Sequence, residues 1–119
     1  MHTYSFEKLE VWQLARKFVG FIYQITKIFP PEEKYGLVTQ IRRASLSIAS
    51  NIAEGSGRKS KKDQSNFYQM AYGSAMEVLN QVIISLDLKL MPENDYFTCR
   101  SKLEELSMKL YALKKAASS

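Results

Sequence analysis

The amino-acid sequence predicts an all-α protein, an antiparallel four-helix bundle whose helices run up, down, up and down. Three observations lead to this prediction. Helix-breaking residues interrupt the chain at three places, the segments between them repeat apolar residues at helical spacing, and the connections are short. Short connections make consecutive helices antiparallel neighbours, and this gives the up-down-up-down order.

The helix-breaking residues set the expected boundaries. Pro30-Pro31 ends the first segment, Gly55-Ser56-Gly57 ends the second as a helix stop and hinge, and Pro92-Glu93-Asn94-Asp95 separates the third from the fourth. Ser60 and Asp63 match the Ser-x-x-Asp pattern of a helix cap before the third segment. We expect helices over residues 6–29, 32–54, 62–91 and 95–117.

The first helix carries two apolar stripes that are one residue out of step. One stripe follows Trp12, Ala15, Val19, Ile22, Thr26 and Phe29, and the other follows Val11, Leu14, Phe18, Phe21, Ile25 and Ile28. One stripe is enough for a place in a four-helix core, so the second needs another surface to cover it. We expect an interface between copies of the chain, formed by Leu14, Phe18, Phe21, Ile25 and Ile28. The alternative is a helix embedded deeply in one bundle.

The other helices each carry a face suited to the same core. The second has an apolar face of Leu37, Ile41, Ala44, Ile48 and Ile52, beside a polar stripe of Gln40, Arg43, Ser47, Asn51 and Glu54. This polar stripe is either a solvated face or part of a network. The third has a core face of Phe67, Met70, Ala71, Ser74, Val78, Val82 and Leu86, widened by Leu79, Ile83 and Leu90. The fourth has a leucine seam of Leu103, Leu106, Leu110 and Leu113, with Cys99 as a small core residue before it.

Length and composition agree with one globular domain over residues 1–119. The mass is 13.7 kDa, 45% of the residues are hydrophobic, and only 5 are Gly and 3 Pro. The longest apolar runs are shorter than the roughly 18 residues that cross a membrane. The first residues lack the basic and apolar regions of a signal peptide. We therefore expect a cytoplasmic protein with no membrane partner.

Residue types also bear on catalysis. The chain has one histidine, His2, and one cysteine, Cys99, so it offers neither the paired ligands of a metal site nor a nucleophile with a histidine base. Gly55-Ser56-Gly57 lacks the Gly-x-x-x-x-Gly-Lys pattern of a phosphate-binding loop. We therefore predict a protein that is not an enzyme and has no catalytic residue, metal or cofactor.

Positive charge is concentrated in one part of the sequence. Seven basic residues and one acidic residue lie between Lys34 and Lys62, a local charge of +6 against a net charge of +5 for the whole chain. Clustered cations beside the N-terminus of a helix attract phosphate. The predicted nucleic-acid contacts are Arg42, Arg43, Arg58, Lys59, Lys61 and Lys62.

Two other interpretations of this region stay open. A basic loop is often simply a solvated segment, and a basic surface also suits an acidic partner protein. Tyr68 and Tyr72 lie one turn apart, where they either stack on bases or form the rim of the core. No recognition-helix, zinc-finger or RNP motif is present in the sequence, so any RNA binding would depend on phosphates and shape.

Several motifs together resemble a bacterial family of small four-helix proteins. They are Gln40-Ile41-Arg42-Arg43-Ala44-Ser45 and Asn51-Ile52-Ala53-Glu54-Gly55, with Val11-Trp12-Gln13, Tyr35-Gly36-Leu37 and Glu77-Val78-Leu79 around them. The family includes the proteins encoded by intervening sequences in 23S ribosomal RNA genes. It is related to the accessory variability proteins of diversity-generating retroelements.

This resemblance implies an assembly and partners. It implies a ring-like homopentamer with a basic surface, and for the retroelement relatives it implies binding to structured RNA or RNA–DNA hybrids together with a reverse transcriptase. The sequence therefore leaves three function hypotheses. The first is a homo-oligomeric bundle that binds structured RNA, and the second is a docking module for a partner protein such as a reverse transcriptase. The third is a nuclease or toxin-like enzyme, against which only the composition speaks.

Overall fold

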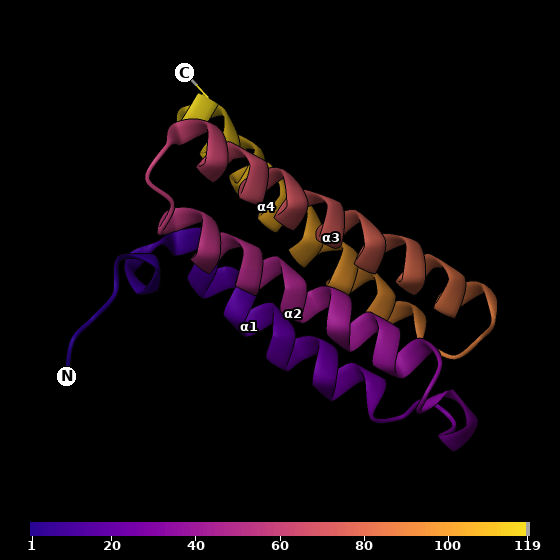
Figure 1. The fold of residues 1–119 in the computed structure, drawn as a ribbon. Helices are drawn as coiled ribbons and strands as arrows, with labels where there is room; N and C mark the ends of the chain where they lie inside the picture. The colour runs from indigo at the N-terminus through magenta and orange to yellow at the C-terminus, as the bar shows by residue number, and fades with distance from the viewer. Residues whose placement is uncertain (119) are drawn as a thin grey trace.

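The computed structural model describes residues 1–118, which contain four α-helices, two short 3-10 turns and no strand (Figure 1). The helices are α1 (Glu10–Thr26), α2 (Leu37–Ser56), α3 (Lys61–Asp87) and α4 (Glu93–Ser118). Each helix runs opposite to the one before it, and α2 and α3 form the most extensive helix pair (Figure 1). The prediction of an all-helical, four-helix fold is confirmed.

The first two helices begin later than expected. The helix expected from residue 6 is interrupted at Leu9, whose backbone is extended, and a 3-10 turn, Ser5–Lys8, precedes α1. A second 3-10 turn, Pro31–Glu33, follows the proline pair, so α2 begins five residues later than expected. Proline is compatible with the first position of a helix, so the late start of α2 lies with Gly36, whose backbone (φ −110°, ψ −111°) leaves the helical region between this turn and α2.

The end of α3 also comes earlier than expected. Lys89 adopts a φ of 60°, the left-handed region, and the Leu90 N–H donates to the Ser85 carbonyl at 2.9 Å. A left-handed residue followed by this bond is a common helix termination. The helix therefore ends at Asp87, before the proline that sequence reasoning took as its limit.

The buried side of α1 follows neither of the two predicted stripes. It takes members from both and runs between them, because adjacent residues on a helix lie about 100° apart. Its residues, each at most 6% exposed, are Val11, Ala15, Phe18, Ile22, Ile25 and Thr26, and Phe29 continues the buried side just after the helix.

The proposed interface on α1 is therefore corrected. Phe18 and Ile25 are buried inside the chain, since α1 contacts both α2 and α4. Leu14 and Phe21 are half-buried at the edge of the same core, and Ile28 is 62% exposed beyond the end of the helix. The five residues do not form one uncovered stripe, because Phe18 and Ile25 face the core of their own chain.

Small polar residues join α2 to α3. The hydroxyl oxygens of Ser47 and Ser74 lie 2.8 Å apart, and the Asn51 amide donates to the Ser47 carbonyl at 2.9 Å. The middle of the predicted polar stripe thus takes part in a network between helices. Gln40, Arg43 and Glu54, at its ends and flank, are exposed.

Gly55 allows the close approach of these two helices. It lies within α2 and is buried, and a Cβ placed there would lie 2.8 Å from the Phe67 Cβ and 2.9 Å from the Tyr68 ring. The helix stop expected at Gly55-Ser56-Gly57 is confirmed, although α2 runs two residues past residue 54: it ends at Ser56, and Gly57 is its C-cap. Gly55 is required by packing rather than by a hinge.

Gly55→Ala is expected to destabilise the protein. Alanine favours a helix over glycine by about 1 kcal/mol, but overpacking against a Cβ and a buried ring costs about 1–3 kcal/mol. Chemical denaturation measures the difference. Gly73→Ala is the matched control, because a Cβ at Gly73 would meet no heavy atom within 4 Å, and it should leave stability unchanged or raise it. Equal effects of the two substitutions would contradict the close approach.

Candidate nucleic-acid interface

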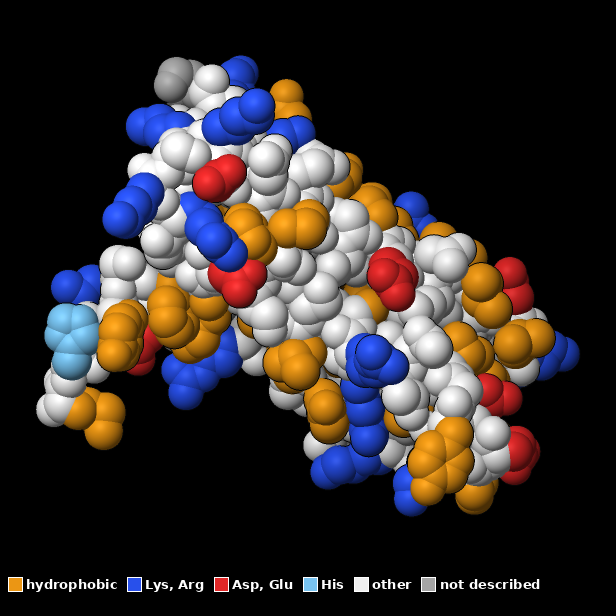
Figure 2. Space-filling view, viewed as in Figure 1, with side chains coloured by type: hydrophobic (Ala, Val, Ile, Leu, Met, Phe, Trp, Pro, Cys, Tyr) orange, Lys and Arg blue, Asp and Glu red, His pale blue; other side chains and the backbone are white. Residues whose placement is uncertain are grey.

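The predicted basic loop lies at one end of the bundle. There the connection between α2 and α3 meets the last turns of α4, and the N-terminal part of the chain lies nearby (Figure 1). Figure 2 shows Lys and Arg side chains gathered at this end, at the upper left of the view. We call this surface the basic end, and its residues are Arg58, Lys59, Lys61, Lys62, Lys114 and Lys115.

The N-terminus of α3 is built as the sequence predicted. Ser60 is its N-cap, and its hydroxyl accepts a hydrogen bond from the Asp63 N–H at 3.1 Å. The remaining N–H groups of the first turn face the basic end with the positive pole of the helix dipole. Lys61 and Lys62 lie in that first turn, so an anion there meets backbone donors and ammonium groups together.

Arg58 is held in place more firmly than its neighbours. Its guanidinium lies 4.5 Å from the centre of the Phe67 ring and 3.6 Å from the Glu54 carboxylate. Its carbonyl accepts a bond from the Gln64 side chain at 3.0 Å. Arg58 therefore joins the loop to both helices while half of its side chain stays exposed.

The lysines of the loop are exposed and unpaired by carboxylates. Within residues 1–118, the ion pairs join Arg58 to Glu54, Arg100 to Glu104 and Lys109 to Glu10, and none includes Lys59, Lys61 or Lys62. Exposed ammonium groups without a carboxylate partner keep their full charge for an external anion.

Two further cations join this surface from the end of α4. Lys61 and Lys62 line a shallow cavity of about 260 Å³ together with Ala117 and Ser118. The Lys114 ammonium donates to the Gln69 side chain of α3, which fixes the two helices side by side at this end. Sequence analysis missed Lys114 and Lys115. The antiparallel order was the available signal, because the fourth helix must end where the third begins.

Arg42 and Arg43 lie elsewhere. From Arg43 to the end of α2 is about 20 Å at 1.5 Å per residue, so the predicted set of six cations does not form one surface. Arg42 instead binds the C-terminal turn of α1, where its Nε donates to the Thr26 hydroxyl at 3.0 Å and its Nη2 to the Tyr23 carbonyl at 3.3 Å.

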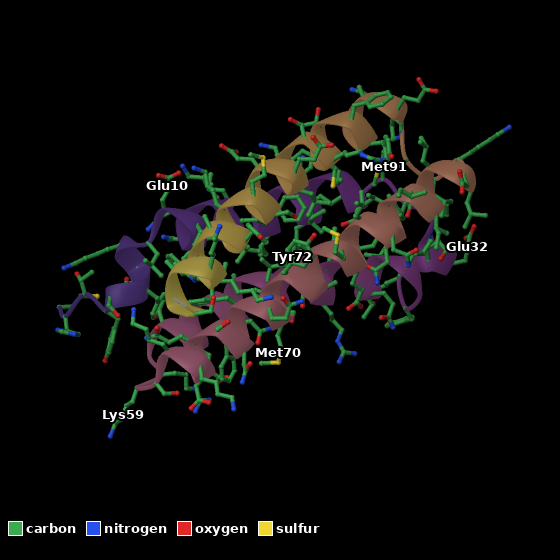
Figure 3. The ribbon with its side chains drawn as sticks, turned by 90° about the horizontal axis from the view of Figure 1, so that it is seen from above. Glu10, Glu32, Lys59, Met70, Tyr72 and Met91 are labelled. Atoms are coloured by element: carbon green, nitrogen blue, oxygen red, sulfur yellow. The ribbon has the colours of Figure 1, made fainter. Side chains whose placement is uncertain are left out.

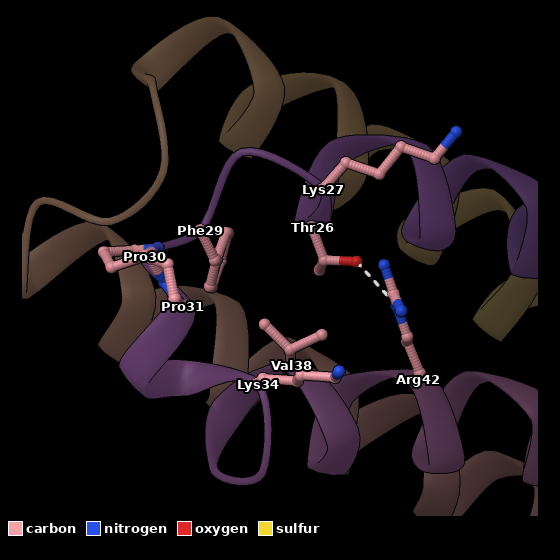
Figure 4. A pocket seen from close by; sticks show the side chains of 8 residues that line it. All are labelled: Thr26, Lys27, Phe29, Pro30, Pro31, Lys34, Val38 and Arg42. Carbon is pink, nitrogen blue, oxygen red and sulfur yellow. Dashed lines mark hydrogen bonds between the residues drawn. The ribbon is translucent and has the colours of Figure 1, made fainter.

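The surroundings of Arg42 explain this placement. Its guanidinium also lies 4.5 Å from the Tyr23 ring centre, and a cation is favourable beside the last carbonyls of a helix. An open pocket of about 330 Å³ lies next to it, and Lys27 and Lys34 are among the residues that line this pocket (Figure 4). Arg43 is exposed on α2. Arg42 thus has a structural role at the opposite end of the bundle.

Two further features of residues 1–118 bear on function. No group of three or more His, Cys, Asp or Glu side chains in this range is placed to hold a metal ion. None of the helices there is long and apolar enough to cross a membrane.

The family follows from a direct comparison. A model of the 23S rRNA-intervening sequence proteins matches residues 7–112, nearly the whole chain. The chain belongs to this family. The resemblance that the sequence motifs indicated is thereby confirmed, and it extends through most of α4, where the motifs gave only a pattern of leucines.

A solved structure shows the same fold. It is the crystal structure of a protein of unknown function from the S23 ribosomal protein family of Bacteroides thetaiotaomicron, with a TM-score of 0.82. The two sequences are 23% identical over 88% of this chain and 98% of the other. At this identity the likeness concerns the helical fold. No curated protein matches the sequence.

Proposed function

We propose that this intervening-sequence protein is a non-enzymatic, homo-oligomeric bundle that binds structured RNA in the cytoplasm through its basic end. The observation that carries the proposal is the gathering of Arg58, Lys59, Lys61, Lys62, Lys114 and Lys115 around the capped N-terminus of α3. Phosphate backbones supply most of the affinity for such surfaces.

Recognition at this surface depends on phosphates and shape. Tyr68, one of the two candidates for stacking on bases, is 4% exposed, and burial raises the pKa of its hydroxyl. Its ring packs beside Gly55 and is closed to a base. Tyr72 is half-buried, lies between α3 and α4 (Figure 3), and is about 15 Å along α3 from Lys62. Without stacking side chains, a folded RNA with closely spaced phosphates fits better than a linear sequence.

Oligomerisation would multiply this surface. The family resemblance implies a ring of five copies, and cyclic symmetry repeats each basic end around the ring. Several moderate phosphate sites on one assembly bind a folded RNA more tightly than separate copies do. A ring would therefore convert a modest patch on each chain into a broad cationic surface.

The triple variant Lys59→Gln, Lys61→Gln, Lys62→Gln tests the proposal. Its RNA affinity should fall, and the plot of log Kd against log salt should flatten by roughly 0.7–0.9 for each lost phosphate contact. Fluorescence anisotropy with a labelled hairpin RNA across a salt series measures both quantities.

A control variant removes the same charge from the other end of the bundle. Lys27, Lys34 and Arg43, each changed to Gln, should lower affinity less and leave the slope closer to that of the wild type. Equal slopes for the wild type and both variants would reject the basic end as the RNA surface. That result would favour the second hypothesis, a docking module for a partner protein.

A further inference from the structure

The connection between α1 and α2 borders an open pocket at the end of the bundle opposite the basic end (Figure 1). Its volume of about 330 Å³ lies in the range of sites for small ligands. Three cations line it, Lys27, Lys34 and Arg42, and no carboxylate of the described chain is among its lining residues. We call it the turn pocket.

Arg42 is fixed at the edge of the turn pocket with donors to spare. Its bonds to the Thr26 hydroxyl and the Tyr23 carbonyl use two of the five N–H groups of a guanidinium. Within residues 1–118 the other three have no hydrogen-bond partner, and the Tyr23 ring lies 4.5 Å from the guanidinium. A guanidinium that is already held in place loses little freedom when it binds an anion.

Lys34 brings a second positive charge to the same pocket. Figure 4 shows its side chain extended toward Arg42, whereas Lys27 points outward. None of the ion pairs within residues 1–118 includes these three cations. The carboxylate of Glu33, the neighbour of Lys34 in the chain, instead accepts a bond from the Leu37 N–H at 3.4 Å. The charges of Arg42 and Lys34 are therefore left to attract an anion from outside.

Apolar side chains form the wall across from Arg42. Figure 4 shows Phe29, Pro30 and Pro31 on that side of the pocket, with Val38 between the two sides. The ring of each proline fixes its φ, which makes this wall rigid. A ligand that fits the turn pocket therefore has an anionic group for the cations and an apolar part for the wall.

We propose that the turn pocket binds a small phosphate monoester that carries an apolar ring. A phosphate monoester has a charge of about −1.5 to −2 at pH 7, which matches Arg42 and Lys34 together. A carboxylate, or a phosphodiester of an RNA backbone, carries a single negative charge. The free N–H groups of Arg42 can bind two phosphate oxygens at once. This ligand differs from that of the basic end, so the inference does not depend on RNA binding.

Titration with phenyl phosphate, followed by NMR of the backbone amides, tests the proposal. The wild type should bind saturably, with shifts centred on Lys34 and Val38. The variant Lys27→Gln, Lys34→Gln changes two exposed side chains, so the fold tolerates it, and it should bind about tenfold more weakly. Phenyl sulfate, of similar shape but with one negative charge, should also bind more weakly than phenyl phosphate, as should inorganic phosphate, which leaves the apolar wall uncovered.

The control Lys59→Gln, Lys62→Gln removes the same charge from the basic end and should keep the affinity of the wild type for phenyl phosphate. Failure to saturate in the millimolar range, shifts centred on the first turn of α3, or equal affinities of the wild type and the pocket variant would each overturn the proposal. Phenyl sulfate or inorganic phosphate that binds as tightly as phenyl phosphate would overturn it as well. A protein that binds phenyl phosphate but no RNA would refute the proposed function alone, and the reverse result would refute this inference alone.

Discussion

Phe18→Glu is expected to unfold the chain rather than to separate folded copies. The Phe18 side chain is 3% exposed, in the centre of the α1 seam, and its ring lies 6.2 Å from that of Phe21. Losing a buried phenylalanine costs about 3–5 kcal/mol. Placing a carboxylate there without a partner adds several kcal/mol more, and the total approaches the roughly 5–15 kcal/mol by which whole domains are stable.

Circular dichroism during thermal unfolding measures this result. The variant should lose most of its helical signal at room temperature, or melt far below the wild type. Gln24→Glu is the control, because it introduces the same side chain at an exposed position of the same helix and should change stability by no more than about 0.5 kcal/mol. If Phe18→Glu instead gave a folded monomer from an assembled wild type, the interface predicted from the sequence would be correct and the buried position wrong.

The misplaced interface shows what periodicity determines in this protein. The two stripes of α1 were visible in the sequence, but both are about equally apolar, so spacing could not tell which angle of the helix faces its neighbours. Contacts with α2 and α4 decided it, and they select a seam between the stripes. In α3 the widened core face holds in part. Leu79 packs half-buried against the core as expected, whereas Ile83 is 36% exposed.

In the candidate site, too, some residues were predictable from the sequence and others were not. The Ser60 cap and the basic loop were predictable because their residues are neighbours in sequence, and local bonds place them. The contribution of Lys114 depends on the end of α4 returning to this loop. Arg42 does not belong to the basic end because the last turn of α1 binds its guanidinium through a carbonyl and a hydroxyl oxygen. The presence of Lys114 at the basic end and the absence of Arg42 from it both follow from helix packing. The spacing of charged residues along the sequence does not predict that packing.

Cys99 is expected to resist thiol reagents in the folded protein. It is fully buried, and burial raises the pKa of its thiol from 9.0 to about 12, with Asp95 adding to the rise and Lys102 opposing it. Since the thiolate is the reactive form, this shift lowers the reactive fraction at pH 8 by about 1000-fold relative to the unfolded chain. Iodoacetamide labelling followed by mass spectrometry, with and without denaturant, measures the ratio. Rapid labelling of the folded wild type at pH 8 would contradict the core position.

The same pKa shift makes stability depend on alkaline pH. Below pH 9 the thiol is protonated in both states, so the folded state keeps the full contribution. Between pH 9 and about 12 the unfolded chain loses this proton and the folded chain retains it, so Cys99 should lower the free energy of unfolding by about 1.4 kcal/mol per pH unit. Denaturation of the wild type and of Cys99→Ala across this range isolates the effect, because every other ionisable group is common to the two proteins. In the Phe18→Glu variant, iodoacetamide should label Cys99 at the rate of the unfolded chain even at pH 8, since Phe18 and Cys99 belong to one core.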